Sequence, residues 1–179
     1  PIKEFTPKSE TARSGVVSAS RCIPFKNLEE QLFLAKRLKI PLTLICVARR
    51  PAEFQYLGHL RQIAPSNVKF IVNASREDVK RILWRSQVYL STTRHEQFGI
   101  AIVEAIAAGC VPLVRNEGGP REIVSFPELR FGTLDELDRR VLAALAGEYD
   151  QIKPSLQRHI QAFDEPRFQQ TLLRAVETL

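Results

Sequence analysis

Residues 87–114, QVYLSTTRHEQFGIAIVEAIAAGCVPLV, decide the fold. Gln87–Ser91 and Val111–Val114 are short apolar runs of the kind that forms buried strands. Between them, the apolar segment Gly99–Ala108 predicts a helix that Gly109 ends. Two such strands joined by a helix favour a parallel pair covered by helices.

The same alternation continues on both sides of this stretch. Further apolar runs predict strands at Val16–Ser20, Leu42–Val47, Val68–Val72 and Leu129–Phe131. Capping pairs and prolines place the helix starts at Asn27 with Glu30, Pro51, Ser75 with Asp78, Pro120, and Thr133 with Glu136. The sequence therefore predicts an α/β fold, a doubly wound, parallel, six-stranded Rossmann-like sheet with helices on both faces.

Three segments follow from this pattern. Residues 1–13 are polar and irregular, and we expect a linker or entry segment there. We expect residues 14–148 to form the Rossmann-like domain and residues 149–179 to form helices that pack on the same domain, the last opened by Pro166. The chain begins at Pro1 and contains no methionine, which fits a piece of a longer protein.

The composition is that of an ordinary soluble globular protein. Of the 179 residues, 44% are hydrophobic and 26% charged, and no apolar run approaches the ~20 residues of a membrane span. No signal-peptide pattern occupies the first twenty residues. Cys22, Cys46 and Cys110 have no spacing that suits zinc, so we interpret them as reduced, buried thiols of a cytoplasmic protein. We expect neither a metal nor a cofactor.

The net charge of +6 favours an anionic partner, such as a sugar nucleotide, an anionic membrane surface or RNA. The basic residues at Arg76, Lys80, Arg81 and Arg85 have the spacing of a helix, and we interpret them as a solvated face. No aromatic residues interleave with them as single-stranded nucleic acid requires for stacking, so a nucleic-acid partner is disfavoured.

Glu104 stands out within the predicted helix Gly99–Ala108, because every other residue there is apolar or glycine. Such a helix is buried on most of its surface, and a buried carboxylate without a partner costs several kcal/mol or more. Glu104 therefore needs a partner, either an arginine of this chain or a ligand.

Polar residues also follow the strands, where parallel sheets bind ligands. Glu96 precedes the buried helix, whose amino-terminal amides at Gly99 form a ready anion site. Arg21 and Lys26 follow the first strand, and two cations near a helix start suit a diphosphate. Gly118–Gly119 follows the fifth strand and leads into a helix, so its amides can face a ligand. Carboxylates such as Glu96 are strong acceptors for sugar hydroxyls.

These residues resemble a known family. The stretch Glu96–Gly109 followed by Asn116–Val124, NEGGPREIV, resembles the Glu-x7-Glu region of family 4 retaining glycosyltransferases, the glycosyl transferases group 1. The loop Ser20–Asn27 resembles that family's Gly-Arg…Lys-Asn loop, and Asn67–Val79 its base-binding strand and helix. Ala162–Phe168 resembles the run that leads into the family's closing helix. The resemblance covers the chain from about residue 14 to its end.

The resemblance implies that the chain is the donor-binding, carboxyl-terminal half of a two-domain GT-B enzyme whose acceptor-binding half is missing. It also implies a role for each matching residue. Glu96 would hold the transferred sugar, and Arg21 and Lys26 would neutralise the diphosphate as the glycosidic bond breaks. The remaining positions would bind the donor: Glu104 the ribose, the amides of Phe98, Gly99 and Ile100 the phosphate or sugar, the backbone of Val72 and Asn73 the base, and Gly118 and Gly119 the sugar pocket.

Two positions depart from the family pattern, Ser20 and Gln97, where glycine is usual or frequent. In having a bulky residue at position 97, the chain resembles relatives that use GDP-mannose, including those that extend lipid-linked oligosaccharides. We therefore expect GDP-mannose, or otherwise a UDP-hexose, as donor, with a lipid-linked acceptor or an anionic membrane surface as partner. Two alternatives stay open, a non-catalytic nucleotide-binding module and a sugar-nucleotide epimerase domain. A dinucleotide-binding domain is disfavoured, because the first strand is not followed by Gly-x-Gly-x-x-Gly.

Overall fold

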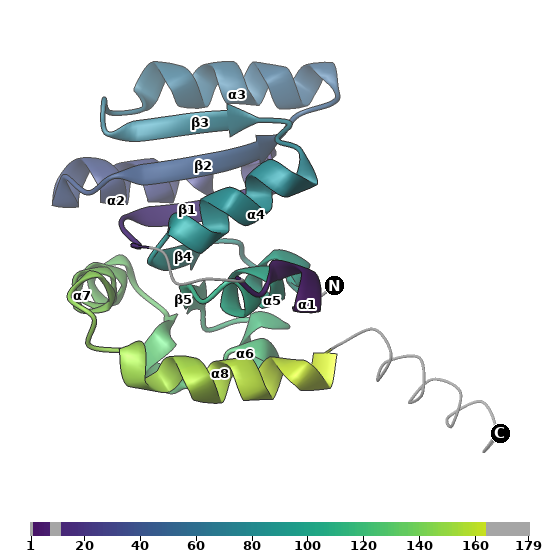
Figure 1. The fold of residues 1–179 in the computed structure, drawn as a ribbon. Helices are drawn as coiled ribbons and strands as arrows, with labels where there is room; N and C mark the ends of the chain where they lie inside the picture. Colours follow the sequence, from purple (N-terminus) through teal and green to yellow (C-terminus); the bar gives the residue numbers. More distant parts are fainter. Residues whose placement is uncertain (1, 8–11, 164–179) are drawn as a thin grey trace, which may run out of the picture.

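A computed structural model of the chain describes residues 2–7 and 12–163. Its centre is one six-stranded parallel sheet in the order β3-β2-β1-β4-β5-β6. Figure 1 shows helices on both sides of this sheet, with α4 in front of it and α2 behind it. This is the doubly wound, Rossmann-like architecture that the sequence predicts.

The strands run at β1 Val16–Arg21, β2 Leu42–Val47, β3 Val68–Val72, β4 Val88–Ser91, β5 Val111–Arg115 and β6 Arg130–Phe131. The α-helices are α1 Ile2–Phe5, α2 Leu28–Leu38, α3 Pro51–Ile63, α4 Arg76–Arg85, α5 Ile100–Ala107, α6 Pro120–Ile123, α7 Leu134–Leu145 and α8 Lys153–His159. Short 3-10 turns occupy Pro24–Lys26, Pro127–Leu129, Asp150–Ile152 and Ile160–Phe163. Of the twelve predicted strand ends, eight coincide with these and four differ by one residue, whereas the predicted helix at Pro166 lies outside the described residues.

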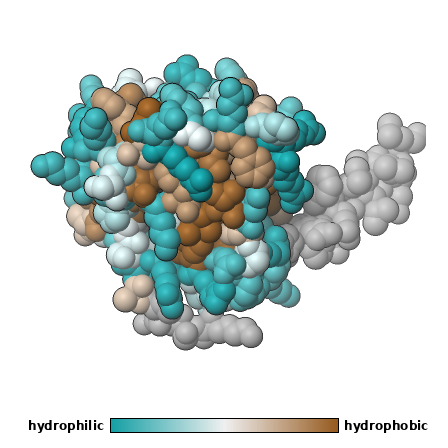
Figure 2. All heavy atoms as spheres, turned by 90° about the horizontal axis from the view of Figure 1, so that it is seen from above, coloured by the Kyte–Doolittle hydropathy of each residue, from teal (hydrophilic) through white to brown (hydrophobic). Residues whose placement is uncertain are grey.

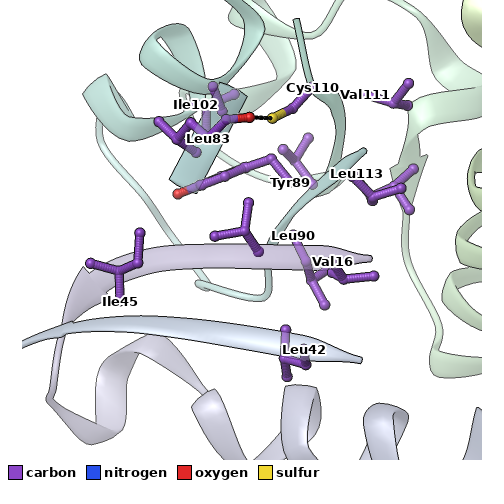
Figure 3. Close-up of a cluster of buried hydrophobic side chains, with 14 of the residues drawn as sticks. Val16, Leu42, Ile45, Leu83, Tyr89, Leu90, Ile102, Cys110, Val111 and Leu113 are labelled. Carbon is purple, nitrogen blue, oxygen red and sulfur yellow. Dashed lines mark hydrogen bonds between the residues drawn. The ribbon is translucent and has the colours of Figure 1, made fainter. Parts of the chain in front are cut away.

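The core lies between the sheet and its covering helices. Tyr89 and Leu90 of β4, Leu113 of β5 and Ile102 of α5 are almost fully buried members of one hydrophobic core cluster (Figure 3). Full burial of one such aliphatic side chain contributes about 1.5–3 kcal/mol. Cys110 lies at the same place, and its thiol is within hydrogen-bond distance of Leu83 O, at 3.2 Å.

All three cysteines are buried and free, as predicted. Burial raises the pKa of the Cys46 and Cys110 thiols to about 12. The two thiols are therefore protonated and act as small apolar side chains of the core.

The outer edge of the sheet is less well covered. Seen from above, where α3 and β3 lie uppermost in Figure 1, apolar side chains form a patch framed by hydrophilic ones (Figure 2). β3 is the edge strand, and its Phe70, Ile71 and Val72 are only partly buried.

Two local predictions are wrong. Residues 2–5 are not irregular but form α1, because Ile2 and Phe5 are buried side chains that anchor it beside α5. The Asn27 side chain does not cap α2, since its backbone is left-handed, with φ 50°, and its amide donates instead to Thr92 O, at 3.3 Å. The predicted caps of α4 and α7 are confirmed, with Ser75 and Thr133 accepting from the amides three residues on.

Candidate functional site

A cavity of about 210 Å³ opens at the carboxyl ends of β1 and β4. The chain leaves β1 toward β2 on one side and returns at β4 on the other, so this is the point where the strand order reverses and where such sheets bind ligands. The structure brings five of the candidate residues together in its wall, namely Arg21, Lys26, Glu96, Gly99 and Ile100. The rest of the wall is mixed, with serine, threonine, glutamine and tyrosine side chains beside Ala19, Ala101 and Ile102.

Lys26 and Glu96 form the central ion pair of this cavity. The Lys26 ammonium lies 2.5 Å from a Glu96 carboxylate oxygen, and the two side chains are only 16% and 23% exposed. The pair joins the loop after β1 to the loop after β4, across 70 residues of sequence. It places a cation beside the amino terminus of α5 and a carboxylate acceptor immediately next to it.

Arg21 is held at the rim of the cavity by Glu53 of α3. The guanidinium is 53% exposed and lies 2.6 Å from a carboxylate oxygen of Glu53, which is itself 6% exposed. The hydrogen bond from Arg21, followed by those from the backbone amides of Arg49 and Arg50, lowers the pKa of Glu53 to about 2. Glu53 is thus a permanent anion that fixes the direction of Arg21.

The turn into α5 depends on Gly99. Its φ of 99° lies in the left-handed region, and a Cβ there would lie 2.7 Å from Ile102 Cδ1. Gly99 and Ile100 line the cavity. Phe98 is 43% exposed and packs edge to face on Phe163, with the ring centroids 5.8 Å apart, rather than lining the cavity.

Gly118 and Gly119 pack directly beneath the Glu96 loop. Added Cβ atoms would lie 2.4 Å from Glu96 O and 2.1 Å from Gln97 O, and the Gly119 amide donates to Glu96 O at 2.9 Å. The two glycines also line a neighbouring cavity of about 760 Å³ that shares Glu96 with the first. Their close approach to the backbone makes them supports of Glu96 as well as wall residues.

Glu104 lies on α5, away from the wall of either cavity, and has the arginine partner that its burial demands. Its carboxylate lies 3.4 Å from Arg76 Nη1 of α4. Burial raises the pKa of Glu104, and the nearby Arg76 charge opposes that rise. The Arg76 side chain is 53% exposed, as expected of a solvated face, and it also bonds Glu4 of α1 at 2.8 Å and stacks over the Phe5 ring at 4.9 Å.

Val72 and Asn73 lie at the end of β3, two strands from β1, and do not line the cavity of Arg21 and Lys26. The Asn73 backbone is left-handed, with φ 52°, and its amide side chain bonds both the N–H and the carbonyl of Ala48. Three residues later, Arg76 begins α4 and faces Glu104. The described residues thus place Asn73, Arg76 and Glu104 around one end of α4, separate from the Lys26–Glu96 centre.

Sequence reasoning missed Glu53 and Arg76. Glu53 has a local signal, because it is the third residue of a helix that Pro51 opens, a position where glutamate caps the helix start. Arg76 has none, since its partners Glu4 and Glu104 lie 72 and 28 residues away. Within residues 2–7 and 12–163, no group of three or more His, Cys, Asp or Glu side chains could hold a metal ion, and no helix could cross a membrane.

Residues 3–129 match the family model described as glycosyl transferases group 1. The chain belongs to this family. Among its curated relatives are the GDP-Man:Man(3)GlcNAc(2)-PP-Dol alpha-1,2-mannosyltransferases of Mus musculus, 32% identical, and of Homo sapiens, 30% identical. Each match covers 78% of this chain and 31% of the relative, so the chain spans about a third of their length.

Solved structures share the fold of this family member. Sucrose-phosphate synthase from Thermosynechococcus elongatus matches with a TM-score of 0.78 and 17% identity, over 99% of this chain and 50% of that one. Anabaena HepE in complex with UDP and glucose matches with a TM-score of 0.76 and 22% identity, over 93% and 49%. The described Rossmann-like sheet therefore corresponds to about half of a GT-B glycosyltransferase.

Proposed function

We propose that this chain is the donor-binding domain of a retaining glycosyltransferase that transfers mannose from GDP-mannose to a hydroxyl of a lipid-linked acceptor. One observation carries the proposal. Arg21, Lys26, Glu96 and the start of α5 converge on one cavity at the reversal point of the sheet. Two cations, a helix amino terminus and a carboxylate match a diphosphate joined to a sugar.

Each group has a distinct part in the proposed reaction. Negative charge develops on the leaving diphosphate as the glycosidic bond breaks, and Arg21, Lys26 and the amides at Gly99 and Ile100 would stabilise it. Glu96 would accept hydrogen bonds from sugar hydroxyls and so orient the anomeric carbon. No metal and no further cofactor enters this scheme, because the diphosphate charge is met by side chains and amides.

The nucleotide would extend from the cavity toward the end of α4. Glu104 would accept the ribose hydroxyls there, and the backbone at Val72 and Asn73 would contact the base. The Arg76–Glu104 contact is long at 3.4 Å, and Arg76 keeps its bonds to Glu4 if Glu104 turns to a ribose. The missing acceptor-binding half would close over this edge of the sheet.

The choice of GDP-mannose and of a lipid-linked acceptor rests on the relatives, whose names specify both. Solved neighbours of lower identity are complexes with UDP, which keeps a UDP-hexose as the competing donor. A lipid-linked acceptor would bring the enzyme to the cytoplasmic face of a membrane. The net charge of +6 favours an anionic surface of that kind.

Calorimetry with GDP, UDP and ADP tests the proposal. We expect GDP to bind most tightly, and K26A to weaken binding by roughly tenfold or more, as for a lost charge-assisted hydrogen bond. K36A is the matched control, since Lys36 is an exposed lysine near the far end of α2. Absence of binding for all three nucleotides at millimolar concentration would refute the proposed function, and a preference for UDP would correct the donor.

A further inference from the structure

Thr92 directly follows β4 and is fully buried, although it is polar. Its hydroxyl lies 3.0 Å from Lys26 O and 2.9 Å from Asn27 O. Thr92 therefore contacts the segment that carries the Lys26 ammonium. Thr92 itself begins the loop after β4, which carries Glu96.

The direction of these hydrogen bonds is fixed by the groups involved. Carbonyl oxygens only accept, so the single hydroxyl hydrogen of Thr92 points to Lys26 O and Asn27 O. The Thr92 oxygen can then only accept from Gln31, whose Nε2 lies 2.9 Å away. Gln31 is 1% exposed, so this donor also has no access to water. The Thr92 hydroxyl consequently accepts a hydrogen bond from α2 and donates to the backbone carbonyls between β1 and α2.

The backbone carbonyl of Thr92 extends the network to β5. It accepts from Asn27 Nδ2 at 3.3 Å and from Arg115 Nε at 3.0 Å. Arg115 is 4% exposed and forms an ion pair with Glu30 of α2. The loops after β1, β4 and β5 are thus tied together at one buried residue. These are the loops that supply Lys26, Glu96 and Gly118–Gly119.

The backbone of Asn27 explains why this tie matters. Its φ of 50° and ψ of 45° are left-handed, a conformation that few residues other than glycine and asparagine adopt. The Thr92 hydroxyl donates to the Asn27 carbonyl and the Asn27 side-chain amide donates to the Thr92 carbonyl, and these two bonds hold Asn27 there. The preceding residue, Lys26, then directs its side chain to Glu96, at 2.5 Å.

We propose that Thr92 is a positioning residue of the donor site. It sets the Lys26 ammonium against Glu96 and the α5 amino terminus without touching the ligand itself. This assignment rests on the proposed function for its effect on nucleotide binding. Its effect on the Lys26–Glu96 pair does not depend on any ligand.

Thr92→Val and Thr92→Ser separate positioning from folding. T92V keeps the side-chain shape and removes the hydroxyl, whereas T92S keeps the hydroxyl. At a temperature where all variants are folded by circular dichroism, we expect T92V to bind GDP roughly tenfold more weakly, since small misplacements of a charged group are costly. T92S should stay within about twofold of the parent chain. S86A is the matched control, because Ser86 is a buried hydroxyl that bonds Ile82 O before the opposite end of β4.

A purely structural role would lower the melting temperature of T92V and leave its GDP affinity equal to that of T92S and S86A, and this result would overturn the proposal.

A double-mutant cycle of K26M and E96Q, read as shifts in melting temperature, gives a test without ligand. We expect their coupling to be present in the parent chain and lost in T92V. Unchanged coupling in T92V would reject the positioning role. A parent chain that binds no nucleotide would instead reject the proposed function.

Discussion

The two glutamates of the Glu96–Gly109 stretch are eight residues apart but meet different partners. Glu96 faces Lys26 in the cavity, whereas Glu104 faces Arg76 beside α4. We therefore expect E104A to weaken binding of GDP and GDP-mannose alike, and E96A to weaken only GDP-mannose. Each loss should be roughly tenfold to a hundredfold, the range for a hydrogen bond to a charged group. Calorimetry with both ligands distinguishes them, and E128A, at an exposed glutamate, is the control.

Glu53 gives the chain an acid-sensitive contribution to stability. Its pKa falls from the usual 4.5 to about 2 in the folded state, because Arg21 and the amides of Arg49 and Arg50 bond the ionised form. A lowered pKa means that this contribution is fully present above about pH 4.5 and is lost as the pH falls toward 2. E53Q should have a lower melting temperature than the parent chain at pH 7. On acidification to pH 3, its melting temperature should fall by less than that of the parent chain. Parallel melting profiles of E53Q and the parent chain would contradict this assignment.

The stability contributed by Glu104 depends on pH in the opposite direction to that of Glu53. Burial raises its pKa above the usual 4.5, so the folded chain binds this proton more readily than the unfolded chain. The stability that this residue contributes is therefore fully present below about pH 4.5 and is lost as the pH rises through the raised pKa of the folded chain. E104Q should melt at a higher temperature than the parent chain at pH 7, and the gain should shrink toward pH 4, because protonation of Glu104 removes the charge that burial disfavours. A melting temperature lowered at both pH values would show that the Arg76 contact outweighs the cost of burial.

Elements support the site through their turns, and the turn into α6 is the tightest of these. A Cβ on Gly119 would lie 2.1 Å from Gln97 O, and backbone cannot yield as a side chain can. G119A should therefore displace the Glu96 loop, lower the melting temperature and abolish binding of GDP-mannose. Gly58 of α3 is the matched control, because a Cβ there meets nothing within 4 Å. G58A should be stabilising by up to about 1 kcal/mol, the helix preference of alanine over glycine.

The elements themselves were predictable because their signals are local. The apolar run at Leu42–Val47 and the capping pairs at Ser75 and Thr133 depend on neighbours within a few residues. Corrections concern contacts between distant parts of the chain. α1 forms because Phe5 is buried and its carbonyl accepts from Trp84 Nε1, 79 residues away. The Asn27 side chain bonds Thr92 O, 65 residues on, instead of capping α2.

The candidate site likewise has a part that the sequence predicts and a part that it does not. The sheet rule alone places Arg21, Lys26, Glu96 and Gly118 near one edge, because each follows a strand of the same parallel sheet. It does not specify which side chains pair. Glu53 binding to Arg21 and the packing of the glycines under Glu96 depend on how the loops fold over one another. Pairing of that kind has no periodic trace in the sequence.

At the scale of the molecule, the chain corresponds to about half of a GT-B glycosyltransferase. The chain covers 49–50% of the solved GT-B neighbours, HepE and sucrose-phosphate synthase. Transfer needs an acceptor hydroxyl held beside the anomeric carbon and water kept out, and both contributions are large. All candidate groups in the described cavities are ones that the proposed function assigns to the donor.

We therefore expect this chain to bind GDP-mannose and transfer no mannose. Glu96 and Lys26 can orient the donor, but attack on its anomeric carbon would come only from solvent water, so slow hydrolysis is the most that the geometry supports. Release of GDP from GDP-mannose, measured with and without simple alcohols, is the test. Release should stay far below the ~10 per second typical of enzymes and should not respond to the alcohol. Rapid, alcohol-dependent release abolished by E96A would show instead that the described sheet suffices for catalysis.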